Sequence, residues 1–236
     1  MEIPFVEDAL TLSRLERKLL VAPEEAREIE ARLAAEVGEP PATRIAVVYF
    51  DAPGMPLAHL AWANPEDCLK VRVREYDPDR SGVAGRSVLE VKRERGGATT
   101  KDRLWVARLE LRAALARTAG RVLPPQARDL EPVAATVYER RAFQRSEEWR
   151  VTVDRGLTFH AASWEAVESV VPLARAVGAA LGGERRAVVE LKSLGATLPR
   201  WLAVLADRCR QAAPYSKFVE AIARATGAAD RDRVGA

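Results

Sequence analysis

The stretch LKVRVREY, residues 69–76, alternates charged and apolar side chains. Neighbouring side chains of an extended strand point to opposite faces, so Lys70, Arg72 and Arg74 share one face. Val71 and Val73 occupy the other face. The three cations then stand about 6 to 7 Å apart, which is the spacing of every second residue on a strand. A row of positive charge at this spacing needs either water or an anion beside it.

The composition is that of an ordinary globular protein. The chain has 236 residues, of which 48% are hydrophobic and 30% charged, and its net charge is only +3. That weak overall charge argues against a general nucleic-acid binder. The first ten residues, MEIPFVEDAL, lack the basic and apolar regions of a secretion signal, and no run of about 18 apolar residues could cross a membrane. We expect a cytoplasmic protein without a membrane segment.

Cysteine and histidine provide no pattern for a disulfide or a metal site. Cys68 and Cys209 lack the paired spacing of a disulfide framework or a zinc site, so we expect both thiols to be reduced. His59 and His160 form no cluster, and neither is expected to act as a ligand or a base. The five tryptophans are expected to pack against the core rather than to stack on bases.

Lysine and arginine are distributed differently along the chain. The 37 basic residues comprise 31 arginines and only six lysines. Apolar periodicity, proline at helix starts and glycine at helix ends predict helices at 23–37, 104–120, 199–213 and 215–226, followed by a disordered tail at 227–236. The cations of the first three helices are arginines. The lysines lie mainly on or beside the predicted strands, which are 12–21, 43–51, 69–76, 87–95, 148–156 and 187–193.

Several of these strands share one amphipathic design. In SVLEVKRER, Glu90, Lys92 and Glu94 share a face, and in AVVELKS Glu190 and Lys192 do the same. One interpretation is that the charged faces are solvated, as is common in antiparallel sheets. The other is that the strands close into a barrel with the charged faces inward and helices over the outward valines. A crowded interior would favour the compact charge of lysine, and it would require an anion or water in the bore.

Eight short motifs follow one another along the chain: ERKLLV, VYFDAP, LKVRVREY, LEVKRE, VYERRAFQ, WRVTVDRGL, VELKS and YSKFVEAI. In order and spacing they resemble the VTC domain, the polyphosphate polymerase domain of the vacuolar transporter chaperone complex, here in a stand-alone prokaryote-type form. That domain belongs to the triphosphate tunnel metalloenzymes, which include CYTH-type triphosphatases. The resemblance implies an α+β fold: a closed antiparallel β tunnel barrel with a polar interior, covered outside by helices, in a single domain over residues 1–226.

The resemblance also implies roles for individual residues. Catalytic roles are implied for Lys18, Arg72, Arg74, Lys92, Arg140, Arg150 and Lys217. Phosphate binding is implied for Lys70, Lys101, Tyr138, Lys192 and Ser216. A divalent cofactor, Mn²⁺ or Mg²⁺, is implied on Glu190, with Glu16 or Glu90 assisting. Arg141, which follows Arg140, is expected to point away from the tunnel.

The implied activity is transfer of the γ-phosphate of ATP to a growing polyphosphate chain inside the basic tunnel. Its partners are ATP or another triphosphate and inorganic polyphosphate, with no nucleic acid. Two alternatives stay open: a triphosphatase of the same fold, in which water is the nucleophile, and a module that binds polyphosphate or nucleotides without turnover. Segment 160–185 matches none of the motifs, and it is left open between a helical insertion and a lid.

Overall fold

The computed structural model describes residues 6–7, 15–77, 87–96, 98–122, 129–145, 148–193 and 198–227. The strands are β1 (Val6–Glu7), β2 (Leu15–Val21), β3 (Thr43–Asp51), β4 (Asp67–Asp77), β5 (Ser87–Arg95), β6 (Ala98–Val106), β7 (Glu131–Arg145), β8 (Trp149–Ala161), β9 (Ala180–Glu184) and β10 (Ala187–Ser193). The helices are α1 (Pro23–Val37), α2 (Pro56–Ala63), the 3-10 helix η1 (Arg108–Glu110), α3 (Leu111–Val122), α4 (Trp164–Glu168), α5 (Leu173–Ala176), α6 (Arg200–Gln211) and α7 (Lys217–Ala225). The fold is therefore α+β, as expected.

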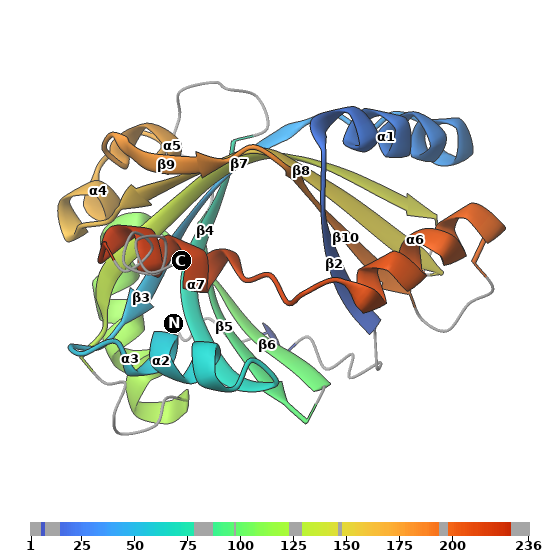
Figure 1. The fold of residues 1–236 in the computed structure, drawn as a ribbon. Coiled ribbons are helices and arrows are strands. Elements are labelled where there is room, and N and C mark those ends of the chain that lie inside the picture. Colours follow the sequence, from blue (N-terminus) through green and yellow to red (C-terminus); the bar gives the residue numbers. More distant parts are fainter. Residues whose placement is uncertain are drawn as a thin grey trace.

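The strands form one strongly curved antiparallel sheet (Figure 1). Its strand order is β1-β6-β5-β4-β3-β7-β8-β10-β2, and β9 pairs with β8. The expected closed barrel is not confirmed, because no pairing in the described part of the chain joins β2 to β1 or β6. Closure by hydrogen bonds needs edge strands of matching length side by side. β1 offers only Val6 and Glu7, which pair with β6.

Apolar side chains of β8 and β10 face away from the concave side of the sheet and are covered by two helices. Val151, Val189 and Leu191 are buried in one cluster with Leu33 of α1 and Leu202 of α6. Helix α1 begins at a proline and ends before a glycine with φ of 82°, so its predicted bounds of 23–37 are confirmed. The outward-facing valines thus have the helical cover that the alternation predicted.

The sequence predicted a helix at 104–120, but the first residues of this range belong to a strand. Residues 98–106 form strand β6, in which Leu104 lies opposite Leu89 of β5, and the helix proper, α3, starts at Leu111. Leu104 fits the helical repeat that continues through Leu111 and Leu115, but pairing with β5 satisfies the backbone groups around Leu104 in the sheet instead. The tertiary partner overrides the local periodicity here.

Segment 160–185 is built into the core as an insertion after the main part of β8. It ends β8, forms α4 and α5, and returns as β9, which pairs with β8. Val167 and Leu173 are fully buried. The amide of Leu173 donates to Glu75 Oε1 at 2.6 Å, and Arg108 Nε lies 3.2 Å from Glu75 Oε2. This buried pair ties the insertion and η1 to the outer face of β4.

Helix α7 lies on the concave side of the sheet (Figure 1). Ser216 caps its N-terminus by accepting a hydrogen bond from the amide of Val219, and Phe218 packs on Tyr49 of β3 with ring centroids 5.3 Å apart. The helix predicted at 215–226 is therefore present. The predicted disordered tail lies, from residue 228 onward, outside the described residues. Among the described helices, none combines the length and apolar character needed to cross a bilayer.

Candidate active site

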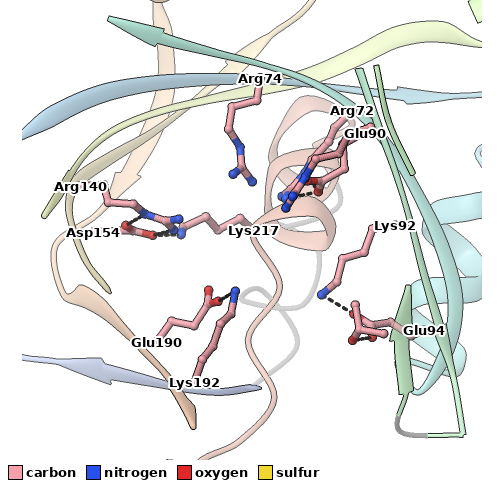
Figure 2. A network of polar contacts seen from close by, with 12 residues as sticks. Arg72, Arg74, Glu90, Lys92, Glu94, Arg140, Asp154, Glu190, Lys192 and Lys217 are labelled. Carbon is pink, nitrogen blue, oxygen red and sulfur yellow. Dashed lines mark hydrogen bonds and ion pairs between the residues drawn. The ribbon is translucent and has the colours of Figure 1, made fainter. Parts of the chain in front are cut away.

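A cavity of about 460 Å³ lies between the concave side of the sheet and the N-terminus of α7. Its walls carry the charged faces of the predicted strands, whose side chains point toward one another (Figure 2). The two carboxylates among the lining residues are Glu90 and Glu190. The lining cations include all six lysines and five arginines: Lys18, Lys70, Lys92, Lys101, Lys192, Lys217, Arg72, Arg74, Arg103, Arg140 and Arg150.

Three lysines form a row across one wall. Lys70 of β4 lies opposite Lys92 of β5, and Lys92 lies opposite Lys101 of β6. Directly opposed side chains start about 5 Å apart at Cβ, where like charges destabilise a sheet. Lys92 pairs with Glu94, whereas Lys70 has no carboxylate partner among the described residues. Burial, and then the charges of Lys92 and Lys18, lower the pKa of Lys70. An anion bound beside this row would reduce the repulsion between its lysines.

The next row along the same wall is Arg72, Glu90 and Arg103. Arg72 Nε donates to Glu90 Oε1 at 2.9 Å, and Arg103 Nε donates to Oε2 at 3.0 Å. Burial would raise the pKa of Glu90, but the charges of Arg72 and Arg74 and the hydrogen bond from Arg103 outweigh it and hold the pKa far below its usual value. Glu90 is therefore a permanent anion that orients two guanidinium groups.

The third row is less charged. Arg74 lies opposite Val88, which lies opposite Trp105. Arg74 Nη1 donates to the hydroxyl of Tyr76 at 3.0 Å, but its Nε is buried without a hydrogen-bond partner. No carboxylate within the described residues pairs with this guanidinium, which points into the cavity (Figure 2). A half-buried cation whose Nε lacks a partner has hydrogen-bonding capacity that a ligand oxygen could use.

On the opposite wall, Asp154 joins β7, β8 and α7. Arg140 Nε and Nη2 donate to the two Asp154 oxygens at 2.6 and 2.8 Å, and Lys217 Nζ donates to Oδ2. Lys217 Nζ also lies 4.4 Å from the ring centroid of Tyr138. Asp154 is fully buried. Burial would raise the pKa of Asp154, but Lys217 and Arg140 outweigh it and lower the pKa. The carboxylate fixes the first residue of α7 to the wall.

Glu190 of β10 is the centre of a second group on this wall. Lys192 Nζ lies 2.7 Å from Glu190 Oε1, and Lys18 of β2 lies directly opposite Glu190 in the register. Burial would raise the pKa of Glu190, but the charges of Lys192 and Lys18 hold it well below the usual value. Nearby Arg150, whose position on β8 is opposite Lys192, has no carboxylate partner in the described part of the chain. Burial and the charge of Arg140 lower the pKa of Arg150.

The cavity as a whole therefore has a surplus of positive charge. Several cations are held by carboxylates, while Lys70, Arg74 and Arg150 have none within the described residues. The cations come from both walls, so a single small anion could not contact them all. The arrangement suits an extended ligand with several negative charges, for which arginine supplies paired donors and lysine supplies point charge.

The family model of the VTC domain matches residues 13–226. The chain belongs to the VTC domain family. No protein with a curated description matches it. The resemblance of the eight motifs is thus confirmed over nearly the whole chain, and the residues that line the cavity lie within the matched range.

Two solved structures are similar to this VTC domain in fold. One is a presumed adenylate cyclase from Bacillus halodurans, with a TM-score of 0.53, 13% identity, and coverage of 88% of this chain and 95% of that chain. The other is a presumed adenylyl cyclase from Hippeastrum with a dominant triphosphatase activity, with a TM-score of 0.50, 12% identity, and coverage of 88% and 94%. At this level of identity the likeness concerns the fold alone.

The carboxylates of the VTC domain fit a divalent ion at one position. Glu90 is occupied by Arg72 and Arg103 and does not fit as a ligand. Glu190 faces the cavity beside Lys192, and it fits a hard ion that takes its other ligands from phosphate oxygens and water. Glu16 is on β2, where its position is opposite Lys192 of β10. The side chain of Glu16 is not among those that the structure describes. No group of three or more His, Cys, Asp or Glu that could hold a metal occurs among the described residues.

The cavity brings together every predicted site residue whose side chain the structure describes. Their roles remain predictions, but their placement in one cavity is observed for Lys18, Lys70, Arg72, Arg74, Glu90, Lys92, Lys101, Tyr138, Arg140, Arg150, Glu190, Lys192, Ser216 and Lys217. Arg141 points away, as expected, and pairs with Glu39.

Asp154, Arg103 and Trp105 were not among the predicted site residues. The alternation of WRVTVDRG places Asp154 on the face of Arg150, but the sequence offered no reason to assign Asp154 a role there. Arg103 and Trp105 lie on β6, which the sequence did not predict as a strand. For this reason the sequence did not predict that the two residues share a face. Both become lining residues only through the pairing of β6 with β5.

Stability should depend on pH through three buried carboxylates at the cavity, Glu90, Asp154 and Glu190. Their folded-state pKa values lie below the ordinary values of 4.5 for glutamate and 3.8 for aspartate. The unfolded chain then binds more protons near those ordinary values, so the stabilisation is full above about pH 5 and is lost as the pH falls below about 4.5. Urea midpoints measured from pH 3.5 to pH 8 test this. A midpoint that stays constant down to pH 3.5 would contradict the role of these ion pairs.

Proposed function

We propose that this VTC domain is a polyphosphate polymerase that transfers the γ-phosphate of ATP to a growing polyphosphate chain, with a divalent metal ion. The supporting observation is the cavity toward which all six lysines and five arginines converge. The charged rows of one wall follow each other about 6 to 7 Å apart, so the positive charge extends along the strands. A chain of phosphates supplies negative charge along its whole length, whereas a single carboxylate or phosphate does not.

Phosphoryl transfer suits such a site because positioning and charge stabilisation provide most of the catalysis. Arg72, fixed by Glu90, presents its remaining donors to phosphate oxygens from one wall. Arg140, fixed by Asp154, does the same from the other wall. Arg74 has a free buried Nε for a further oxygen. The two walls together hold the donor and acceptor phosphates in line.

The reaction needs no side-chain nucleophile. An oxygen of the terminal phosphate of the chain attacks the γ-phosphorus, and a new phosphoanhydride bond forms. The bond between the γ-phosphorus and the bridging oxygen to the β-phosphate breaks, and ADP leaves with that electron pair. The attacking oxygen is already anionic near neutral pH, so no general base is required. The lysine row neutralises charge that accumulates on the bound phosphates.

Triphosphate tunnel enzymes generally use divalent metals. Glu190 is the residue that would hold such an ion here, together with phosphate oxygens, and either Mg²⁺ or Mn²⁺ would reduce the negative charge of the β- and γ-phosphates. Lys192 and Lys18 flank Glu190 and would contact the same phosphates when a ligand is present.

The polymerase proposal is tested by supplying ATP with Mn²⁺ and separating the products by chain length, with free phosphate measured in parallel. We expect polyphosphate longer than any added primer, one ADP per added phosphate, and no product after chelation of the metal. Inorganic tripolyphosphate should also raise the melting temperature, since a ligand bound only by the folded state stabilises it by about 2.7 kcal/mol at 100 times its Kd.

Other products would point to other activities of the same cavity. Free phosphate without polymer would replace the polymerase by a triphosphatase, an activity that the Hippeastrum protein of similar fold possesses. Tripolyphosphate binding without product in either metal would leave a module that binds polyphosphate or nucleotides. If millimolar tripolyphosphate does not change the melting temperature, the cavity is not an anion site.

A further inference from the structure

Thr152 of β8 places a hydroxyl group in the wall of the cavity. The residue lines the cavity, yet only 4% of it is exposed. Its Oγ1 atom is buried, and no hydrogen-bond partner for this atom occurs in the described part of the chain. A hydroxyl in this state has lost its hydrogen bonds to water without replacement, whereas a valine of the same shape would avoid that loss. The hydroxyl therefore has bonding capacity that a ligand in the cavity could use.

The neighbours of Thr152 explain why its hydroxyl has no partner. Asp154 shares its face of β8, but both oxygens of Asp154 already accept hydrogen bonds from cations. On β7 the opposite residue is Ala142, which has no polar side-chain atom. On β10 the opposite residue is Glu190, whose carboxylate also lines the cavity (Figure 2). Of the two residues directly opposite Thr152, the one with side-chain oxygens is thus the residue that fits a divalent ion.

Glu190 and Thr152 together form a small set of oxygen ligands. Residues directly opposite each other in an antiparallel pair start about 5 Å apart at Cβ, so the two side chains can reach a common ion. Small hard ions such as Mg²⁺ are held by one or two carboxylates and take further oxygens from phosphates and water. In P-loop enzymes a serine or threonine hydroxyl is one of the protein ligands. A hydroxyl suits a buried position because, unlike a second carboxylate, it carries no charge that must be desolvated.

We propose that the Thr152 hydroxyl is a ligand of the divalent ion beside Glu190, an inference that rests on the proposed function. The oxygen lone pair of the hydroxyl binds the ion, and its proton is donated to an oxygen of the bound phosphates. The site then bridges β8 and β10, and the remaining ligands come from phosphate oxygens and water. Because Lys192 and Lys18 flank Glu190 and repel a free cation, the ion binds together with the triphosphate rather than alone.

The test is calorimetric binding of inorganic tripolyphosphate, once as its Mn²⁺ complex and once free of metal in the presence of a chelator. The ratio of the two affinities is the metal gain. The ion and tripolyphosphate associate in solution identically for every variant, so a change in the metal gain reports the affinity of the protein-bound complex for the ion. Thr152→Val should reduce the metal gain about tenfold, the lower end of the losses caused by removing a residue that supports a metal ion. It should change metal-free binding by less than about twofold.

Two further variants serve as controls. Thr152→Ser keeps a hydroxyl and should keep most of the metal gain. Thr136→Val removes the hydroxyl of a threonine that is also buried, on β7, but lies outside the residues that line the cavity, so it should leave both affinities unchanged. The melting temperature of ligand-free Thr152→Val should be no lower than that of the wild type, because the lost hydroxyl had no partner among the described residues.

An unchanged metal gain in Thr152→Val would overturn the threonine ligand. A loss that is equal with and without Mn²⁺ would also overturn it, because the hydroxyl would then contact a phosphate oxygen. Glu190→Gln separates this failure from that of the proposed metal site: if it alone removes the metal gain, the ion is bound at Glu190 without Thr152. If the wild type shows no metal gain, the proposed metal role itself fails, and this inference fails with it. If the wild type makes no polymer but Thr152→Val shows the expected loss, the polymerase proposal fails and the threonine ligand stands.

Discussion

Replacing Arg74 with alanine should lower kcat/KM for ATP about 100-fold to 1000-fold, the effect of removing one preorganised donor from a charge-stabilising site. Arg74 is half-buried, its buried Nε has no hydrogen-bond partner, and no described carboxylate pairs with it. Its removal breaks no ion pair, although it ends the hydrogen bond to Tyr76 and takes one positive charge away from Glu90, which offsets the relief of repulsion from the other lining cations. We expect a melting temperature close to that of the wild type. Steady-state kinetics and thermal unfolding of the same preparation measure both effects.

Arg141→Ala is the matched control for Arg74→Ala. Arg141 also lies on a long strand of the same sheet, but it points outward to Glu39. Its removal should leave kcat/KM within about twofold, because an exposed ion pair contributes little. Arg72→Ala differs from both, since Arg72 holds buried Glu90 and its loss leaves that carboxylate to Arg103 alone. If Arg74→Ala unfolds the protein while retaining activity in the folded fraction, Arg74 is a structural residue.

Replacing Asp154 with asparagine should destabilise the fold by about 3 to 5 kcal/mol, the usual effect of removing one partner from a buried ion pair. Asp154 is fully buried and accepts hydrogen bonds from both Arg140 and Lys217. The asparagine has nearly the same shape but no charge, so two cations would remain together without an anion. Urea unfolding at pH 7 measures the loss.

An added polyanion should restore part of this stability. If the site of the Asp154→Asn variant binds phosphate oxygens, saturating tripolyphosphate supplies the missing negative charge near Arg140 and Lys217. The difference in unfolding free energy between the variant and the wild type should then become smaller. Asp102→Asn is the control: Asp102 pairs with Arg93 at 2.5 Å, but both side chains are partly exposed. Its effect should stay within about 1 kcal/mol. A loss at Asp154 no larger than at Asp102 would contradict its anchoring role.

The alternation of residues along each strand predicted much of the fold. The strand at 43–51 is present and largely buried, and the strands at 69–76 and 187–193 are present with their charged and apolar faces as expected. The prediction succeeds because the two-residue repeat of side chains follows from the backbone geometry of a strand. A strand shifted by one residue would place its valines toward the cavity and its arginines against the helices, which would raise the free energy of the fold. The strand β6 was missed because its residues are mainly polar and its only strong apolar stretch, LWV, also fits the following helix.

Sheet closure could not be predicted from the strands themselves. Whether two edges meet depends on the length of the edge strands and on the residues between them, and β1 contributes only Val6 and Glu7. The insertion at 160–185 was equally unpredictable, because its short helices owe their place to Glu75 and Arg108, which are far away in the sequence.

The order of residues alone shows which side chains share a face, and so it shows that lysines and arginines line one side of the strands. It does not show which of these cations keep their charge available for a ligand. That distinction was made by folding: the register of neighbouring strands sets Glu90 against Arg72 and Arg103 and Asp154 against Arg140. Lys217 reaches Asp154 from 63 residues away in the sequence, while Arg74 receives no carboxylate partner among the described residues. The physical reason is that the facing direction of a side chain is local, whereas the interaction of two charges depends on the distance between chain segments in space.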